Sequence, residues 1–206
     1  MDQISENIRQ IKKTFHLFMN GVTSRSMRDK GLEYKVNWGI PFAQLKEIAS
    51  GYEKSYELAS GLWKDDIREC KILATMLMPT DKFSSELADE WIMHTKSVEI
   101  AEMCALNLFQ YVNDAHLLAL RWMDDDNNAI AQICAYHVFC RLIMKGFRPD
   151  KDQSGHFLKS VHKVFADDNT SLKHAAMNCL MRFISIDENY SALADSALAD
   201  MKTDIF

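Results

Sequence analysis

Apolar residues recur with helical spacing along most of the chain, and this periodicity limits the fold more than any other feature. The segment 172–183 is the clearest case, because its apolar positions fall at i, i+3, i+4, i+7, i+8 and i+11 and form one continuous stripe. Residues 130–142 follow a similar pattern, and no segment alternates in the manner of a strand. With only 7 glycines and 3 prolines, the chain has few of the breakers that a β-sandwich needs. An all-α fold is therefore predicted.

The same periodicity places the helices along the chain. The expected ranges are 2–20, 41–50, 53–61, 66–78, 83–94, 98–111, 114–123, 128–144, 151–166, 170–184 and 188–202. Residues 21–40 are expected to form one long irregular stretch. The patterns Asp66-x-x-Glu69 and Ser185-x-x-Glu188 resemble capping boxes and mark two expected helix starts.

A weak internal repeat indicates how the helices are assembled. The segment DDDNNAIAQICAYHVF matches ADDNTSLKHAAMNCLM at an offset of 42 residues, which aligns Ile130 with Leu172 and Cys134 with Ala176. Degenerate repeats of two helices, about 40 residues long, are typical of HEAT-like arrays. The prediction is one domain over 1–206, an α-α superhelix of HEAT-like or armadillo type in which antiparallel helix pairs form a curved stack.

Composition and local motifs exclude several classes of site. The first residues lack an apolar signal region, and no apolar run approaches the roughly 18 residues of a membrane span, so a soluble, cytoplasmic protein with no membrane partner is expected. The five cysteines lie in apolar helical segments and are expected to be reduced and buried. The seven histidines lack zinc-ligand spacing and the glycines form no phosphate loop, so neither a metal nor a cofactor is expected.

An ordered series of short motifs lies between about residues 25 and 80. It consists of the turn YKVNWGI (34–40), the helix segment LKEIA (45–49), the pair Leu62-Trp63, and a helix that contains Arg68, Glu69, Lys71, Leu73 and Ala74. In order and spacing these motifs resemble the N-terminal signature of the AlkD-like DNA alkylation repair family. Trp63 is expected to be buried between helix pairs, and Arg68 and Glu69 are expected to pair with neighbouring elements or solvent.

The resemblance implies a helical cradle for double-stranded DNA and, in the active members of the family, a glycosylase that removes cationic alkylated purines in base excision repair. The implied site contains a Trp, an Asp four residues later, an Arg on the next repeat and a Trp on the one after. Aromatic faces attract the cationic base, and the carboxylate stabilises the positive charge that develops on the sugar. Here the corresponding residues are Val98, Glu102, Gln132 and Asn178, so the carboxylate alone remains, as Glu102 or its one-turn neighbour Glu99.

Charge is unevenly distributed along the chain. Residues 1–54 contain nine basic and six acidic side chains, 85–130 contain two and nine, and 131–185 contain eight and four. The acidic middle segment disfavours phosphate, and Glu99 with Glu102 also fits a solvated helix edge. The two basic zones are the candidate contacts for a DNA backbone. Their candidate side chains are Arg25, Arg28, Lys30, Arg148, Lys159, Lys163 and Lys173.

Three functions are compatible with these observations. The first is an active glycosylase with a remodelled site, although the replaced Trp, Arg and Trp positions argue against it. The second, which we predict, is a DNA-binding member of the family with little or no glycosylase activity. The alternative is a HEAT-like scaffold that binds a protein partner and has no DNA role. Fold alone does not separate these functions, because they depend on the site.

Overall fold

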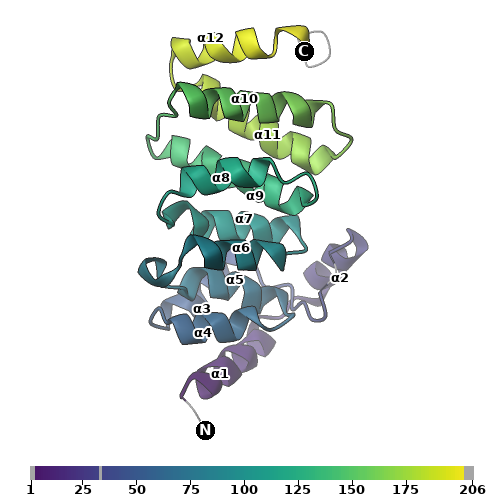
Figure 1. Ribbon diagram of the computed structural model, residues 1–206. Coiled ribbons are helices and arrows are strands. Elements are labelled where there is room, and N and C mark those ends of the chain that lie inside the picture. The colour runs from purple at the N-terminus through teal and green to yellow at the C-terminus, as the bar shows by residue number, and fades with distance from the viewer. Residues whose placement is uncertain (1–2, 33, 202–206) are drawn as a thin grey trace. The chain divides into compact units, whose positions relative to one another are not determined.

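The computed structural model describes residues 3–32 and 34–201, which form twelve α-helices and three short 3-10 helices (Figure 1). Within these ranges the β-pairing consists of an isolated bridge between Val36 and Ile67. The all-α prediction is confirmed. Contacts divide the chain into two compact units, unit 1 (Met1–Ser84) and unit 2 (Ser85–Phe206). Each unit is described by itself, and the expectation of a single domain over 1–206 stays a prediction.

Unit 1 is built around a small apolar core. Its helices are α1 (Gln3–Phe18), α2 (Gly21–Asp29), α3 (Phe42–Ser50), α4 (Tyr56–Trp63) and α5 (Arg68–Leu77), followed by η1 (Thr80–Lys82). Helix α1 packs on α3 and α4, and α5 packs on both of the latter. Ile11, Phe15, Leu45 and Leu62 are fully buried between these helices. Helix α2 buries only Ser24, so polar contacts hold it in place.

Unit 2 consists of two layers of helices. The helices are α6 (Ser85–Met93), α7 (Val98–Asn107), α8 (Ala115–Met123), α9 (Ala129–Met144), α10 (Lys151–Phe165), α11 (Thr170–Ile184) and α12 (Glu188–Ala197), with η2 (Phe109–Tyr111) and η3 (Ala199–Met201). Figure 1 shows α6, α8, α10 and α12 in one layer and α7, α9 and α11 behind them. The second layer is the more tightly packed, because α9 lies directly against both α7 and α11, whereas α10 touches α8 and α12 over fewer residues.

Aromatic side chains fill the space between the layers of unit 2. Phe157 of α10 stacks on Phe139 of α9 with 5.1 Å between ring centroids, and it contacts Phe183 of α11 at 5.0 Å. All six apolar positions of the 172–183 stripe are buried, which confirms that this stripe faces the core. Of the residues aligned by the internal repeat, Cys134 and Ala176 are both fully buried at close helix contacts.

The expected irregular stretch over 21–40 is wrong in its first half, where α2 forms. Asn20 caps α2, since its side chain accepts a hydrogen bond from the Thr23 backbone N–H at 3.0 Å. The helix is short and mostly exposed, so it has no apolar stripe for a periodicity analysis to detect. Exposed Arg25 and Arg28 lie on this helix, and Lys30 follows it.

Both expected capping boxes are also wrong. Helix α5 begins after Ile67 without a side-chain cap, because Ile67 is extended and bridged to Val36, which places the helix start two residues after Asp66. Helix α12 is capped by Asp187, two residues after the expected Ser185. A true capping box stands at α10, where Asp150 and Gln153 bond to each other's backbone N–H groups at 2.9 and 3.0 Å.

The motif residues at the start of α5 form a buried anchor for the 34–40 turn. The carboxylate of Glu69 accepts hydrogen bonds from the backbone N–H groups of Trp38 (3.1 Å) and Ile40 (3.3 Å), and Arg68 donates to both the Ile40 carbonyl and Glu69 at 3.0 Å. Glu69 is fully buried. Trp63 is also buried as expected, with the Lys71 ammonium 4.4 Å from its ring centroid. These motif residues therefore build the fold of unit 1.

Candidate nucleic-acid interface

The outward face of the α7–α9–α11 layer collects the ionisable side chains of the candidate site. On α9, His137 and Arg141 are four residues apart and therefore lie on one face of the helix, opposite the buried Val138 and Phe139. On α7, Glu102 points toward the same place, since its Oε1 lies 3.4 Å from Nε2 of His137. The structure thus brings together one side chain found by sequence analysis, Glu102, and two that it missed.

Burial shifts the pKa of both groups in the Glu102–His137 contact toward the neutral form. Burial, and next the nearby Glu99, raise the pKa of Glu102, while Arg141 acts in the opposite direction. Burial, and next Arg141, lower the pKa of His137, so its imidazole is neutral at pH 7. At 3.4 Å the contact therefore joins the Glu102 carboxylate to a neutral imidazole and is not an ion pair at pH 7. Arg141 is the permanent positive charge of this cluster.

One nitrogen of the Arg141 guanidinium group makes no hydrogen bond within the described part of the chain. This nitrogen, Nε, is buried. Arg182 of α11 belongs to the same neighbourhood, since its charge and that of Arg141 both act on the half-buried Cys140. The pKa of the Cys140 thiol is lowered to about 7 by its hydrogen bond to Cys179 and then by Arg182 and Arg141, against the opposing effect of burial. The face therefore presents two cationic side chains from neighbouring helices.

The other three residues aligned with the family's site, Val98, Gln132 and Asn178, lie in three different environments. Val98 is the first residue of α7, half-buried and one turn before Glu102. Asn178 is exposed on α11, four residues before Arg182. Gln132 is buried and donates to the Met123 carbonyl at 3.1 Å, so its amide is turned away from Glu102. The next arginine after Gln132 in the chain is Arg141, on the same helix.

The 131–185 basic zone divides between the two layers of unit 2. Lys159 and Lys163 project from α10, and Lys163 pairs with Asp126. Lys173 lies half-buried on α11, in the layer of Arg141 and Arg182, and Arg148 is exposed between α9 and α10. In unit 1, Lys12 pairs with Asp65 at 2.8 Å. The geometry does not rank these candidates as DNA contacts, and they stay predictions.

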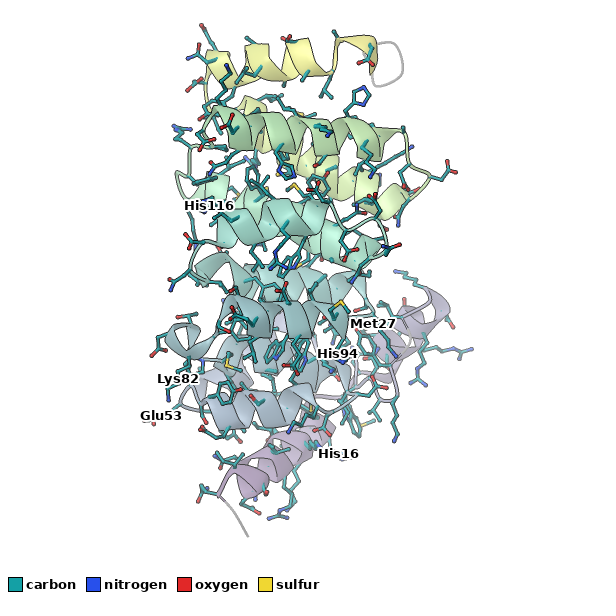
Figure 2. All side chains as sticks on the ribbon, viewed as in Figure 1. His16, Met27, Glu53, Lys82, His94 and His116 are labelled. Carbon is teal, nitrogen blue, oxygen red and sulfur yellow. The ribbon has the colours of Figure 1, made fainter. Side chains whose placement is uncertain are left out.

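Within 3–32 and 34–201, no group of three or more His, Cys, Asp and Glu side chains is arranged to hold a metal ion. In unit 2, for example, His94 follows α6 while His116 belongs to α8 (Figure 2). None of the described helices is long and apolar enough to cross a bilayer.

Comparison with known proteins places this geometry in a family. Among solved structures, one chain described as belonging to "a new family of proteins related to the HEAT-like repeat DNA glycosylases with affinity for branched DNA structures" matches with a TM-score of 0.77 and 18% identity. The match covers 94% of this chain and 81% of that one, and at this identity it establishes a HEAT-like repeat fold alone. No curated protein matches the chain. A family model described as "DNA alkylation repair enzyme" matches residues 11–200, and the chain therefore belongs to that family.

Proposed function

We propose that the protein is a DNA-binding member of this family with little or no alkylpurine glycosylase activity. The observation that carries the proposal is the pair Arg141 and Arg182 on the outward face of the α7–α9–α11 layer, with the Nε of Arg141 buried and without a partner. Guanidinium groups bind phosphate oxygens through paired N–H donors, and a rigid helix holds such donors ready for a backbone. The structural relative's affinity for branched DNA supports the same class of ligand.

The residues around Glu102 do not suit base excision. Release of a cationic purine requires stabilisation of positive charge on the departing base and on the sugar. Val98 and Asn178 offer no aromatic face to the base. Glu102 stands without an aromatic or cationic companion from the family's pattern, since Val98, Gln132 and Asn178 occupy the other three positions. The face can therefore hold a backbone, while the groups that drive the chemistry are absent from it.

Binding is tested with fluorescently labelled duplex and four-way-junction DNA, by anisotropy between low and moderate salt. We expect binding without sequence preference, with an affinity that falls steeply with salt because each phosphate contact contributes a slope of about −0.9. Arg141→Gln with Arg182→Gln should flatten that slope by about 2. Lys159→Glu with Lys163→Glu tests the other layer, where we expect the smaller change because Asp126 already engages Lys163.

The outcomes separate the candidate surfaces. A larger effect from the α10 pair would move the interface to the α8–α10 layer and overturn the role of Arg141. Absence of DNA binding at low salt would refute the proposal and favour a protein-binding scaffold. A specific observation supports that second candidate, since Leu17 and Val22 in unit 1 are 80% and 83% exposed apolar side chains close together in the chain.

Glycosylase activity is expected to be at background level. Incubation with alkylated duplex DNA should release no methylated purine beyond the uncatalysed rate, because removal of one electrostatic group already costs on the order of 100-fold or more. Released bases are measured by chromatography, with DNA binding confirmed on the same sample. Excision by the purified protein that Glu102→Gln abolishes would contradict this expectation and identify Glu102 as a catalytic residue.

A further inference from the structure

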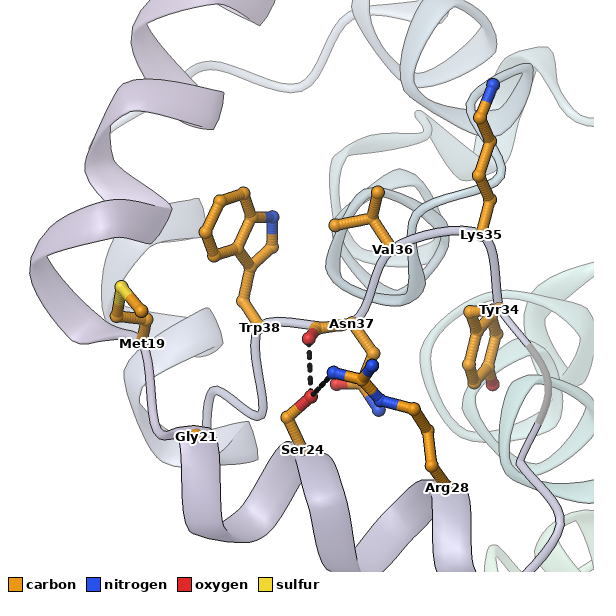
Figure 3. A pocket seen from close by; sticks show the side chains of 9 residues that line it. All are labelled: Met19, Gly21, Ser24, Arg28, Tyr34, Lys35, Val36, Asn37 and Trp38. Carbon is orange, nitrogen blue, oxygen red and sulfur yellow. Dashed lines mark hydrogen bonds between the residues drawn. The ribbon is translucent and has the colours of Figure 1, made fainter.

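Unit 1 contains a cavity of about 290 Å³ between α2 and the segment 34–38 (Figure 3). Its walls are fixed by hydrogen bonds that cross it. Ser24 donates to the Asn37 carbonyl at 2.7 Å, and Arg28 donates through Nη2 to the Ser24 hydroxyl at 2.8 Å. At one end, the backbone N–H of Asn20 is bonded to the Trp38 carbonyl at 2.8 Å. The cavity is therefore formed before any ligand arrives, which lowers the entropic cost of binding.

The charge of the lining is positive. Arg28 and Lys35 both line the cavity, one from α2 and the other from the facing segment, and none of its described lining residues is acidic. Figure 3 shows the Arg28 guanidinium lying across the cavity toward Ser24 and Asn37. The Lys35 ammonium extends away from this guanidinium in the same view, so Arg28 is the cation that faces Ser24 and Asn37. The planar N–H groups of arginine match the oxygens of a phosphate.

Two aromatic side chains complete the lining. Tyr34 and Trp38 stand on the segment opposite α2, and Ser24 and Asn37 add hydroxyl and amide groups. The indole Nε1 of Trp38 is buried without a hydrogen-bond partner among the described residues. Aromatic faces beside cationic groups are the combination that binds a nucleotide, because the base stacks on the ring while the phosphate meets the charge.

We propose that this cavity receives one unpaired nucleotide of a DNA strand, with its phosphate at Arg28 and its base against Tyr34. The proposal rests on the proposed DNA-binding function and adds the structural feature that the protein would select. At about 290 Å³ the cavity has the lower-limit size of a small-molecule site, so it accommodates a single nucleotide and excludes a base pair. Bases inside a duplex are stacked and paired, whereas those at strand ends and branch points reach a pocket at little cost.

The pocket is tested first without DNA. Thymidine 5′-monophosphate, thymidine and inorganic phosphate are titrated separately into the full chain, and amide chemical shifts of the 19–38 segment are followed by NMR. We expect saturable shifts with the monophosphate, weaker ones with either fragment, and loss of the response in Arg28→Gln. Arg25→Gln, an exposed cation on the same helix that does not line the cavity, is the matched control and should respond as the natural protein does. A response to phosphate equal to that of the nucleotide, or no saturable response, overturns the proposal.

DNA with and without a single-stranded end then separates this inference from the general function. We expect the natural protein to prefer a duplex with an unpaired overhang over a blunt duplex by about tenfold, the typical value of one base–aromatic contact. Tyr34→Ala, which removes no charge, should abolish that preference while blunt-duplex affinity persists, and Arg28→Gln should lower affinity for the overhang DNA more than for the blunt duplex. Equal losses on both DNAs would make Arg28 an ordinary backbone contact and overturn the pocket while leaving DNA binding intact. Failure of all DNA binding, with the mononucleotide response retained, would refute the proposed function and leave a free-nucleotide site, which also overturns the strand proposal.

Discussion

Replacement of Glu69 by alanine is expected to lower the free energy of unfolding of unit 1 by about 3–5 kcal/mol, as for other buried ion pairs that lose one partner. The carboxylate holds the N–H groups of Trp38 and Ile40, and it is the counter-ion of Arg68, which is only 3% exposed. Its removal leaves a buried guanidinium and two backbone donors without an acceptor. The 34–40 turn, which forms the wall of the cavity, then keeps the isolated β-bridge and the Arg68–Ile40 bond at the start of α5 but loses its hydrogen bonds to the carboxylate.

Urea unfolding followed by circular dichroism measures this loss. Glu47→Ala is the matched control, because Glu47 is an exposed glutamate of α3 in the same unit, and its replacement should change stability by less than about 0.5 kcal/mol. Glu69→Gln keeps one carbonyl oxygen and should fall between the two. Glu69→Ala with a midpoint equal to that of Glu47→Ala would show that the anchor contributes nothing.

Replacement of Gly39 by alanine should have the second largest effect, about 2–5 kcal/mol. Gly39 has φ +68°, a conformation that costs an L-residue roughly 1–2 kcal/mol. A Cβ there would also collide with the Asn20 carbonyl and stand 2.7 Å from the Ser24 N–H, and overpacking of this kind adds about 1–3 kcal/mol. Both contacts are with backbone at the start of α2, so relief requires the helix to move.

Gly31 provides the control that separates strain from collision. It has φ +82°, but a Cβ at this position would meet nothing within 4 Å. Gly31→Ala should therefore lose only the conformational part, about 1–2 kcal/mol. Thermal unfolding of the two variants, compared with the natural protein, gives the difference. Equal losses would mean that α2 adjusts freely and that its contact with the 34–40 segment is loose.

Most of the fold was predictable because long helices carry their core-facing positions in the sequence. Burial of the 172–183 stripe could be predicted without tertiary information, since a continuous apolar face packs against the core. Helix α2 was missed because a side-chain cap and hydrogen bonds to the 37–38 backbone hold it, and these leave no periodicity. The start of α5 was misplaced because Ile67, the residue after the expected cap, is extended and bridged to Val36 from much earlier in the chain.

The site was less predictable than the fold. Glu102 could be found because the family's pattern keeps a carboxylate there. His137 and Arg141 belong to a different repeat, and their approach to Glu102 follows from the register of α9 against α7, which the sequence alone does not specify. Gln132 was aligned with the family's Arg position, but the alignment could not show that its amide is hydrogen-bonded to the last carbonyl of α8. The cavity beside α2 could not be predicted either, because it depends on this helix, which leaves no periodicity in the sequence.

The layered packing of unit 2 has a consequence for how such a protein diverges. Each helix of α7, α9 and α11 buries one side against its neighbours, and the groups on the outward side, such as Glu102 and Asn178, contribute little to that packing. Substitution on the outward face therefore leaves the stack intact, while the buried side needs only apolar residues of suitable size. This tolerance of substitution agrees with the solved relative, which keeps the fold at a TM-score of 0.77 while sharing 18% sequence identity. A few substitutions can therefore change the chemistry of the outward face, because the packing of the helices depends little on the side chains that this face presents.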